Sequence, residues 1–224
     1  MNKQLFREIK SYILRPGRMT EGQKRAIDTL MPLYGIKKSA ERINIQKYFN
    51  KQSPIFINIG FGNGKELIDL STRNPNKNFL GIEVHSPGIG RLLLSIKKLK
   101  IENIRVINGD AIEVIRDMIG DETITGINLF FPDPWPKKRH HKRRIITHNF
   151  IKLVSRVLEK DGHLHISTDW DNYVQHIQEI MSQYDNFLKI NQLSHRPETK
   201  FEKRGEKLGH KIQDIEYKKI SNLA

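Results

Sequence analysis

The feature that most constrains the fold of this chain is a regular alternation of short apolar segments and amphipathic segments, which begins at Pro54. The apolar segments read as buried strands, and the amphipathic segments repeat apolar residues with helical spacing. Strands buried on both faces are typical of a parallel sheet covered by helices. The expected strands cover 55–59, 79–84, 104–107, 124–131 and 163–167, with weaker strands at 186–193 and 211–220. The expected helices cover 65–73, 89–99, 111–118, 147–158 and a segment that ends near 181.

The first fifty residues differ from this pattern. They are polar, and they contain a short expected helix that follows Thr20 and is broken near Pro32 and Gly35. The sequence has no internal repeat and no low-complexity linker. We therefore expect a basic N-terminal arm over 1–50, packed on a single α/β domain over 51–224.

The 39 Lys and Arg residues outnumber the 25 Asp and Glu residues by 14, and this excess is confined to three segments. Residues 1–25 carry a net charge of +5, residues 137–144 carry +6 and residues 196–219 carry +3. Separated blocks of positive charge favour a polyanion-binding surface over a uniformly basic protein. Solvated tails are the alternative, and the two interpretations differ in whether the three segments lie around one site.

Several classes of protein are excluded by what the sequence lacks. It contains no cysteine, which excludes disulfides, thiol catalysis and cysteine-ligated metal, and we expect no metal site. No run approaches the roughly 18 apolar residues that a membrane-spanning helix needs. The first residues also lack the apolar stretch of a signal peptide. We therefore expect a cytoplasmic protein without membrane contact.

A glycine-rich turn follows the first expected strand, at Gly60, Gly62 and Gly64. Glycine lets the backbone turn tightly and lets a ligand approach without a Cβ in the way. A dinucleotide fingerprint has the spacing G-x-G-x-x-G, and Lys65 stands at its last position here, which disfavours NAD. Ligands of parallel sheets bind beyond the carboxyl ends of the strands, so the polar residues after the following strands are candidates for the same site.

Acceptor side chains follow the second and third strands. Glu83 ends the second strand, and its carboxylate can accept hydrogen bonds from both ribose hydroxyls of an adenosine. Asn108 and Asp110 follow the third strand, where a side-chain acceptor can take the adenine amino group, although Asp110 is also placed to cap the helix that begins at Ala111. This pattern predicts an adenosine-containing ligand without a pyrophosphate. S-adenosyl-L-methionine (AdoMet) fits it better than NAD.

The fourth strand leads into the most unusual segment, in which Asp133 and Trp135 each lie between prolines. Three prolines within five residues stiffen this loop. The basic run 137–144 follows at once. An aromatic ring beside cations suits stacking on an unpaired base whose phosphates the cations hold.

Two further polar segments lie nearer the C-terminus. Thr168 or Asp169 is expected to cap the helix after the fifth strand, and Asp169 shares its rim of the sheet with Asp133. Residues 199–205 join the two weak strands, and without other information they read as an ordinary loop.

At these residues the sequence resembles the bacterial single-chain tRNA (guanine-N7)-methyltransferase family, in order from about residue 15 to about residue 217. The most specific part of the match is the proline-bracketed Asp-Trp with the basic run, 131–144. The other matching motifs are 15–20, 59–64, 81–88, 108–111, 167–169 and 199–202.

The resemblance implies a class I AdoMet-dependent methyltransferase fold: a seven-stranded, mostly parallel sheet with an antiparallel last strand and helices on both faces. It implies that AdoMet is the cofactor and that N7 of a guanine in the variable loop of tRNA is methylated. The expected partner is tRNA, with no obligatory protein partner, and the chain is expected to be a monomer or a homodimer.

Carried over residue by residue, the resemblance implies Asp133 as the catalytic position. The expected cofactor-binding residues are Asn58, Gly60, Gly62, Gly64, Glu83, Asn108, Asp110 and Asp133. The expected substrate-binding residues are Lys137, Asp169, Thr199, Lys200, Phe201 and Glu202. The expected phosphate contacts are Arg139, Lys142, Arg143 and Arg144. There is one departure, because the family usually has Glu where this chain has Asn58, and Asn keeps an acceptor but loses the charge.

Three alternatives remain open at this point. A class I methyltransferase acting on another RNA, on DNA or on a protein is compatible with the glycine turn and Glu83, but the Asp-Trp segment opposes it. An NAD-dependent oxidoreductase is disfavoured by Lys65 and by basic segments that a small substrate does not need. A non-catalytic RNA-binding protein with an inactive cofactor pocket is suggested only by Asn58.

Overall fold

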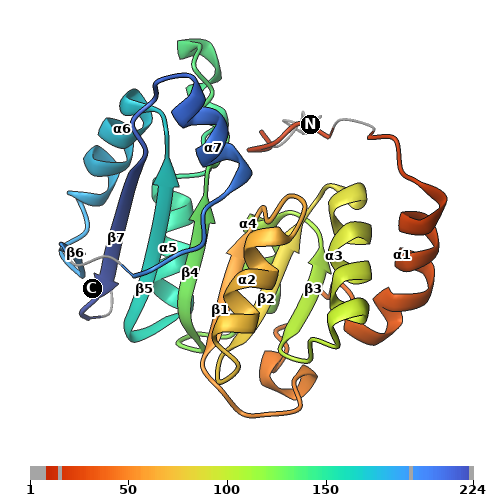
Figure 1. The fold of residues 1–224 in the computed structure, drawn as a ribbon. Helices are drawn as coiled ribbons and strands as arrows, with labels where there is room; N and C mark the ends of the chain where they lie inside the picture. Colours follow the sequence, from red (N-terminus) through yellow and green to blue (C-terminus); the bar gives the residue numbers. More distant parts are fainter. Residues whose placement is uncertain (1–8, 15–16, 192–193, 222–224) are drawn as a thin grey trace, which may run out of the picture.

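The computed structural model describes residues 9–14, 17–191 and 194–221, which fold around one seven-stranded sheet (Figure 1). The strand order is β3-β2-β1-β4-β5-β7-β6. The strands are β1 (Ile55–Ile59), β2 (Asn78–Glu83), β3 (Ile104–Asn108), β4 (Ile124–Phe130), β5 (Leu158–Thr168), β6 (Phe187–Ile190) and β7 (Gln213–Lys219). Strands β1 to β5 pair in parallel, and β7 pairs antiparallel with both β5 and β6. The expected class I methyltransferase sheet, with its antiparallel last strand, is confirmed.

Helices cover both faces of this sheet, and each face has its own apolar core. The helices are α1 (Glu21–Tyr34), α2 (Lys65–Arg73), α3 (Ser86–Leu99), α4 (Ala111–Met118), α5 (His148–Val157), α6 (Asp171–Met181) and α7 (Lys200–Lys207). One cluster of buried residues joins the sheet to α4, α5 and α6, and a second joins it to α2, α3 and α1. Burial on both faces explains why strands such as Ile55–Ile59 are nearly continuous apolar runs.

Helix α1 begins after Thr20 and ends before Gly35, as expected, and Thr20 forms a capping box with Gln23. The helix continues through Pro32, which therefore does not break it. Proline removes the hydrogen bond to the carbonyl four residues earlier, and Asp28, which carries that carbonyl, is an exposed residue. The proline also lies in the last turn, so little helix remains to be disrupted.

Two more segments differ from the expectation. Residues 200–207 form the helix α7 rather than a loop. Residues 138–143 of the basic run form a short 3₁₀ helix, η2 (Lys138–Arg143). Another 3₁₀ helix, η1 (Ile45–Tyr48), precedes β1. Strand β5 also begins earlier than expected, at Leu158, because an irregularity in its pairing with β4 separates Leu158 from the pairs that begin at His163. The core elements were predicted closely, and the differences lie where local pattern is weak.

The sheet has a switch in strand order at β1, which lies between β2 and β4. From this point the chain runs outward to β3 on one side and to β5 on the other. Ligands of such sheets bind at the carboxyl ends of the strands beside the switch. Within the described ranges, no helix is long and apolar enough to cross a membrane.

Candidate active site

The glycine turn after β1 presents open backbone to the carboxyl edge of the sheet. Gly60 and Gly62 have φ angles of +68° and +58°, and a Cβ added at either would meet nothing within 4 Å. Gly64 also has a positive φ, but a Cβ there would lie 2.8 Å from Leu92, so its role is helix packing. The positive φ angles favour glycine at all three positions, and the open space at Gly60 and Gly62 leaves the backbone accessible from the cavity.

Glu83 is fixed beside this turn at the end of β2. Its side chain is buried, and its Oε2 accepts a hydrogen bond from the Gly62 N–H at 2.8 Å. Its Oε1 accepts hydrogen bonds from the N–H groups of Val84 and His85 at 2.7 and 3.0 Å. Three donors hold the carboxylate in one orientation at the wall of a cavity, which suits an acceptor for hydroxyl groups.

The residues after β3 divide into two kinds. Asp110 is buried, caps α4 through a 2.9 Å hydrogen bond from the Ile112 N–H, and lies 3.2 Å from the Lys10 ammonium. Asn108 is exposed and does not line the cavity, although Gly109 and Ala111 do. Neither Asn108 nor Asp110 lines the cavity, and the Asp110 carboxylate serves as the cap of α4 and as a partner of Lys10.

A cavity of about 230 Å³ lies at the switch point, against the ends of β1, β2 and β4. Its wall is mostly apolar, with a few polar groups. Seventeen of the described residues line it: Ser11, Tyr12, Ile59, Gly60, Gly62, Ile82, Glu83, Val84, Gly109, Ala111, Leu129, Phe130, Phe131, Pro132, Asp133, Ile145 and Phe201. An apolar cavity with a few convergent polar groups is the usual form of a small-molecule site.

The N-terminal arm closes one side of this cavity, which the sequence did not predict. Ser11 and Tyr12 line it, and Figure 1 shows the arm above the strand ends, on the same side of the molecule as α7. The arm is held by Lys10, which lies 2.6 Å from Glu113 and 3.2 Å from Asp110. Hydrogen bonds from Lys10 and Lys38 lower the pKa of Glu113. No local pattern in the sequence indicates these long-range contacts.

Asp133 lines the same cavity from the loop that follows β4. The loop is strained at both ends, since Phe131 and Trp135 have φ angles of +52° and +48°. It is also anchored: the Phe131 N–H donates to the Ser167 carbonyl at 2.8 Å, and the Trp135 indole donates to the Ser11 carbonyl at 3.2 Å. A strained and anchored loop that holds an exposed carboxylate at a cavity is a candidate for chemistry.

Arg144 does not have the role that the sequence predicted. It is 3 % exposed, and its guanidinium donates to the Pro134 carbonyl at 3.0 Å and to the Asn172 Oδ1 at 2.7 Å. It also lies over the ring of Tyr173. Arg144 therefore braces the proline-rich loop from below, and a phosphate cannot reach it.

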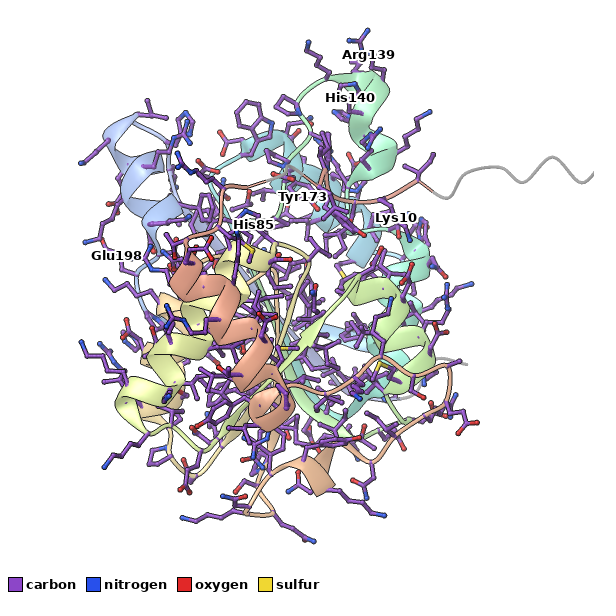
Figure 2. All side chains as sticks on the ribbon, turned by 90° about the vertical axis from the view of Figure 1, so that its right-hand side faces the viewer. Lys10, His85, Arg139, His140, Tyr173 and Glu198 are labelled. Carbon is purple, nitrogen blue, oxygen red and sulfur yellow. The ribbon has the colours of Figure 1, made fainter. Side chains whose placement is uncertain are left out.

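The rest of the basic run projects from the molecule. Lys137, Lys138, Arg139 and Lys142 are exposed, and Figure 2 shows Arg139 and His140 at the tip of this projection. Desolvation and the neighbouring positive charges lower the pKa of His140. Arg143 lies over the Trp135 ring, at 5.1 Å from its centroid. The exposed members can meet phosphates, whereas Arg143 also packs on the loop.

Helix α7 brings Phe201 to the wall of the main cavity, and Lys200 lines a smaller cavity that adjoins it. Phe201 stacks on Phe131, with ring centroids 6.2 Å apart, and Lys200 extends over the Phe201 ring. Thr199 is buried and forms a capping box with Glu202, so both are parts of the helix start. Glu202 also accepts hydrogen bonds from Arg196. Its carboxylate is thus committed to the protein, which opposes a direct substrate contact.

A buried network behind α7 was missed by the sequence analysis. Arg196 is 7 % exposed, pairs with Asp214 and Glu202, and lies 5.7 Å from the ring centroids of Phe130 and Phe131. Burial raises the pKa of Asp214, but hydrogen bonds from His165, Arg196 and Ser167 outweigh it and hold that pKa well below its usual value. The basic excess of 196–219 had suggested only RNA contact. Its most buried arginine instead fixes α7 against the cavity wall.

Two remaining predicted residues lie beside the cavity rather than in its wall. Asp169 pairs with His210 at 3.0 Å. Asn58 is 4 % exposed and lines a smaller adjoining cavity with Asn128. Of the matching N-terminal segment, Arg15 and Pro16 lie outside the described residues.

Comparison with known proteins also indicates a methyltransferase. The methyltransferase family model Methyltransf_4 matches residues 52–215. The chain is 44% identical over 216 residues to the tRNA (guanine-N(7)-)-methyltransferase of Nitrosococcus oceani, covering 95% of this chain and 92% of the relative. It is 43% identical over 225 residues to that of Vibrio parahaemolyticus, covering 97% and 94%.

Solved structures share the fold at low sequence identity. An rRNA methylase from Streptococcus thermophilus is 14% identical with a TM-score of 0.52, and the match covers 92% of this chain and 100% of that one. An S-adenosylmethionine-dependent O-methyltransferase from Thermotoga maritima is 13% identical with a TM-score of 0.53, covering 93% and 69%. A phosphoethanolamine N-methyltransferase from Haemonchus contortus, solved in complex with S-adenosyl-L-methionine, is 13% identical with a TM-score of 0.53, covering 79% and 51%. The full-length identity to curated relatives, on a sheet of this order, shows that the chain belongs to the tRNA (guanine-N(7)-)-methyltransferase family.

Proposed function

We propose that this chain transfers a methyl group from AdoMet to N7 of a guanine in the variable loop of tRNA. The family supports the reaction and the tRNA substrate. The observation in the structure that carries the proposal is the cavity at the switch point, which Glu83 and the glycine turn border on one side and Asp133 on the other. A cofactor site and a rim for a substrate base thus share one cavity.

The residues present fit AdoMet. Glu83 would accept the ribose hydroxyls, and Gly60 and Gly62 leave open backbone for the rest of the ligand. Asp110 would mark the adenine end of the site, under the N-terminal arm. When bound, AdoMet supplies a methyl group on a positively charged sulfur.

The chain needs no strong base for this reaction. Guanine N7 carries a free lone pair and is an acceptor, so it can attack the methyl group without first losing a proton. The protein's task is alignment of the reacting atoms, which can supply roughly 7–11 kcal/mol in the best cases. A rigid cavity wall and a proline-stiffened loop are suited to that task.

Asp133 is the residue to which we assign the catalytic role. Its carboxylate would accept a hydrogen bond from the N1 or amino edge of the guanine and so fix the base. Because the guanine ring becomes cationic on methylation, a carboxylate at the rim also stabilises the transition state electrostatically. Glu202 is less suited to this role, because Arg196 and the α7 capping box already use its carboxylate.

The exposed lysines and Arg139 of the basic run would hold phosphates beside the rim. The N7 target lies within folded RNA, so local rearrangement or extrusion of the base accompanies binding. Phe201, which is 42% exposed beside Phe131, offers a ring on which an extruded base can stack. We further propose that the enzyme acts in the cytoplasm as a monomer or homodimer and needs no other protein.

The test is incubation of the purified chain with AdoMet labelled in the methyl group and with total tRNA, DNA or protein in separate reactions. The proposal predicts label in tRNA alone, released as 7-methylguanine on base analysis. Label in DNA or protein would favour a different target. AdoMet binding without any transfer would favour a non-catalytic RNA-binding protein.

A further inference from the structure

A second, smaller cavity of about 30 Å³ opens beside the main one. The two share Ile59, Gly60, Phe130 and Phe201 in their walls, so they are neighbouring parts of one site. The smaller cavity lies between β1, β4 and the start of α2. A volume of this size corresponds to one water molecule in the liquid, so it suits one small polar group rather than a second ligand.

The wall of this small cavity is mostly apolar, but several polar side chains interrupt it. It contains the side-chain amides of Asn58 and Asn128, which lie side by side on β1 and β4, and the carboxylate of Glu66 from the first turn of α2. The Asn128 amide reaches the Asn58 Oδ1 only at 3.5 Å, a long contact. The amides thus retain hydrogen-bonding capacity toward a group placed between them and Glu66.

Charge selects the kind of group. Two charged residues line the small cavity, Glu66 and Lys200. The Lys200 ammonium lies over the Phe201 ring, 4.8 Å from its centroid, and Glu66 supplies the negative charge of this wall. Of the carboxylates at the main cavity, Glu83 already accepts three backbone donors, and neither Glu83 nor Asp133 lines the small cavity. An ammonium group is about the size of a water molecule and donates three hydrogen bonds. The Glu66 carboxylate and the neighbouring amide oxygens are acceptors for such hydrogen bonds.

We propose that this small cavity holds the ammonium group of the methionine end of AdoMet and that Glu66 is its anionic partner. The proposal rests on the proposed function and deepens it by assigning a cofactor-binding residue outside the glycine turn. It also accounts for Asn58: with the negative charge supplied from α2, the buried position on β1 remains neutral and serves as a hydrogen-bond acceptor.

Glu66 has one further contact, and the test must separate the two roles. Its Oε1 accepts a hydrogen bond from the Lys200 N–H at 3.2 Å, which links α2 to the start of α7. If Glu66 acted only as an anchor of α7, its loss would alter tRNA binding or stability. It would not change the affinity for a ligand that carries the amino-acid portion of the cofactor relative to the affinity for a ligand that lacks it.

The experiment measures, by calorimetry, the binding of two ligands that differ only in the amino-acid portion. S-adenosylhomocysteine carries the ammonium and carboxylate groups, and 5′-methylthioadenosine lacks both. The variants are Glu66→Gln and, as a matched control, Asp69→Asn, which removes a carboxylate from the same helix but lines neither cavity.

Glu66→Gln is expected to weaken S-adenosylhomocysteine about tenfold, in line with the loss of a charge-assisted hydrogen bond at a half-exposed site. Binding of 5′-methylthioadenosine should stay unchanged, and Asp69→Asn should alter neither ligand. Equal affinities of wild type and Glu66→Gln for S-adenosylhomocysteine would overturn the assignment, as would an equal loss for both ligands. If the wild-type chain bound neither ligand, the proposed function itself would fail.

Discussion

Asp133 is held at the cavity rim by a strained loop, and at the scale of single residues it carries the strongest chemical assignment. Replacement Asp133→Ala should lower kcat on tRNA by at least about a hundredfold, because fixation of the base and charge stabilisation are lost together. Binding of S-adenosylhomocysteine should change far less. Single-turnover kinetics and calorimetry measure the two effects, and near-normal turnover would remove Asp133 from any catalytic role.

Asn58 gives a second prediction at this scale. Replacement Asn58→Glu restores the carboxylate usual in the family, next to a site where Glu66 already supplies a negative charge. Affinity for AdoMet should therefore stay within about threefold of wild type or become tighter. Calorimetry measures it, and a large loss of affinity would show that the position does not face the methionine end.

The positions of the candidate cofactor-binding residues at the strand ends could be predicted, because the topology of a parallel sheet determines where its strand ends lie. Gly60, Gly62 and Glu83 end two adjacent strands, and they line the cavity as expected. Arg144 and Glu202 could not be placed in the same way, because a charged residue in a basic or polar segment gives no sign of whether it faces solvent or a buried partner. Their burial depends on Asn172 and Arg196, residues that become neighbours only through the fold.

At the scale of elements, the contribution of the N-terminal arm to ligand binding can be tested directly. Replacement Lys10→Ala removes the contacts with Asp110 and Glu113 and frees the arm, whose Ser11 and Tyr12 line the cavity. We expect S-adenosylhomocysteine to bind about threefold to tenfold more weakly, measured by calorimetry. Lys38→Ala is the matched control, because Lys38 also pairs with Glu113 but is not part of the arm. Equal effects of the two variants would speak against a closing role for the arm.

Strand β7 gives a prediction about pH. Burial raises the pKa of Glu216, but hydrogen bonds from His163 and from Ser194 outweigh it and lower that pKa to about 2, while Asp214 on the same strand is shifted in the same direction. In the unfolded chain these groups have pKa values near 4. Their contribution to stability is therefore complete above about pH 5 and is lost as the pH falls from about 4 toward 2.

Urea unfolding at fixed pH values measures this dependence. The contribution of Glu216, taken as the difference in unfolding free energy between wild type and Glu216→Gln, should be constant from pH 7 to 5 and should shrink below pH 4. The variant Glu216→Gln should be less stable at pH 7 and should lose less stability on acidification. A variant with the wild-type slope below pH 4 would contradict the linkage.

Elements with strong periodicity were predictable almost to the residue, and α2 over Lys65–Arg73 and α4 over Ala111–Met118 are examples. Helix α7 was not, because its eight residues are almost all polar and only Gly205 is buried. Its helical form depends on the Thr199 capping box and on the anchoring of Glu202 by Arg196. Such short helices are stabilised by tertiary contacts rather than by propensity.

At the scale of the whole molecule, segments far apart in sequence meet at one cavity. Ser11 from the arm and Phe201 from α7 line it together with Asp133, which precedes the basic run 137–144 in the chain. This arrangement favours a tRNA-binding surface around the cavity over solvated tails. The family's tRNA substrate requires such a surface, since phosphate contacts dominate affinity for nucleic acids.

The salt dependence of tRNA binding tests this arrangement. Replacement of Lys138, Arg139 and Lys142 by Ala should reduce the slope of log affinity against log salt by about 2, which corresponds to three phosphate contacts on a single strand. The control replaces the exposed Lys97, Lys98 and Lys100, at the far end of α3, and should leave the slope unchanged. Equal slopes for the two triple variants would show that the basic run is a solvated surface and does not contact phosphates.

The most direct test of the account is to map the methylated position. Unmodified tRNA transcripts would be incubated with the enzyme and AdoMet and then cleaved by chemistry that cuts the chain only at 7-methylguanine. The account predicts one AdoMet-dependent cut, at a guanine in the variable loop, that disappears with the Asp133→Ala enzyme. A cut at another position, or no cut with an enzyme that binds S-adenosylhomocysteine, would contradict it.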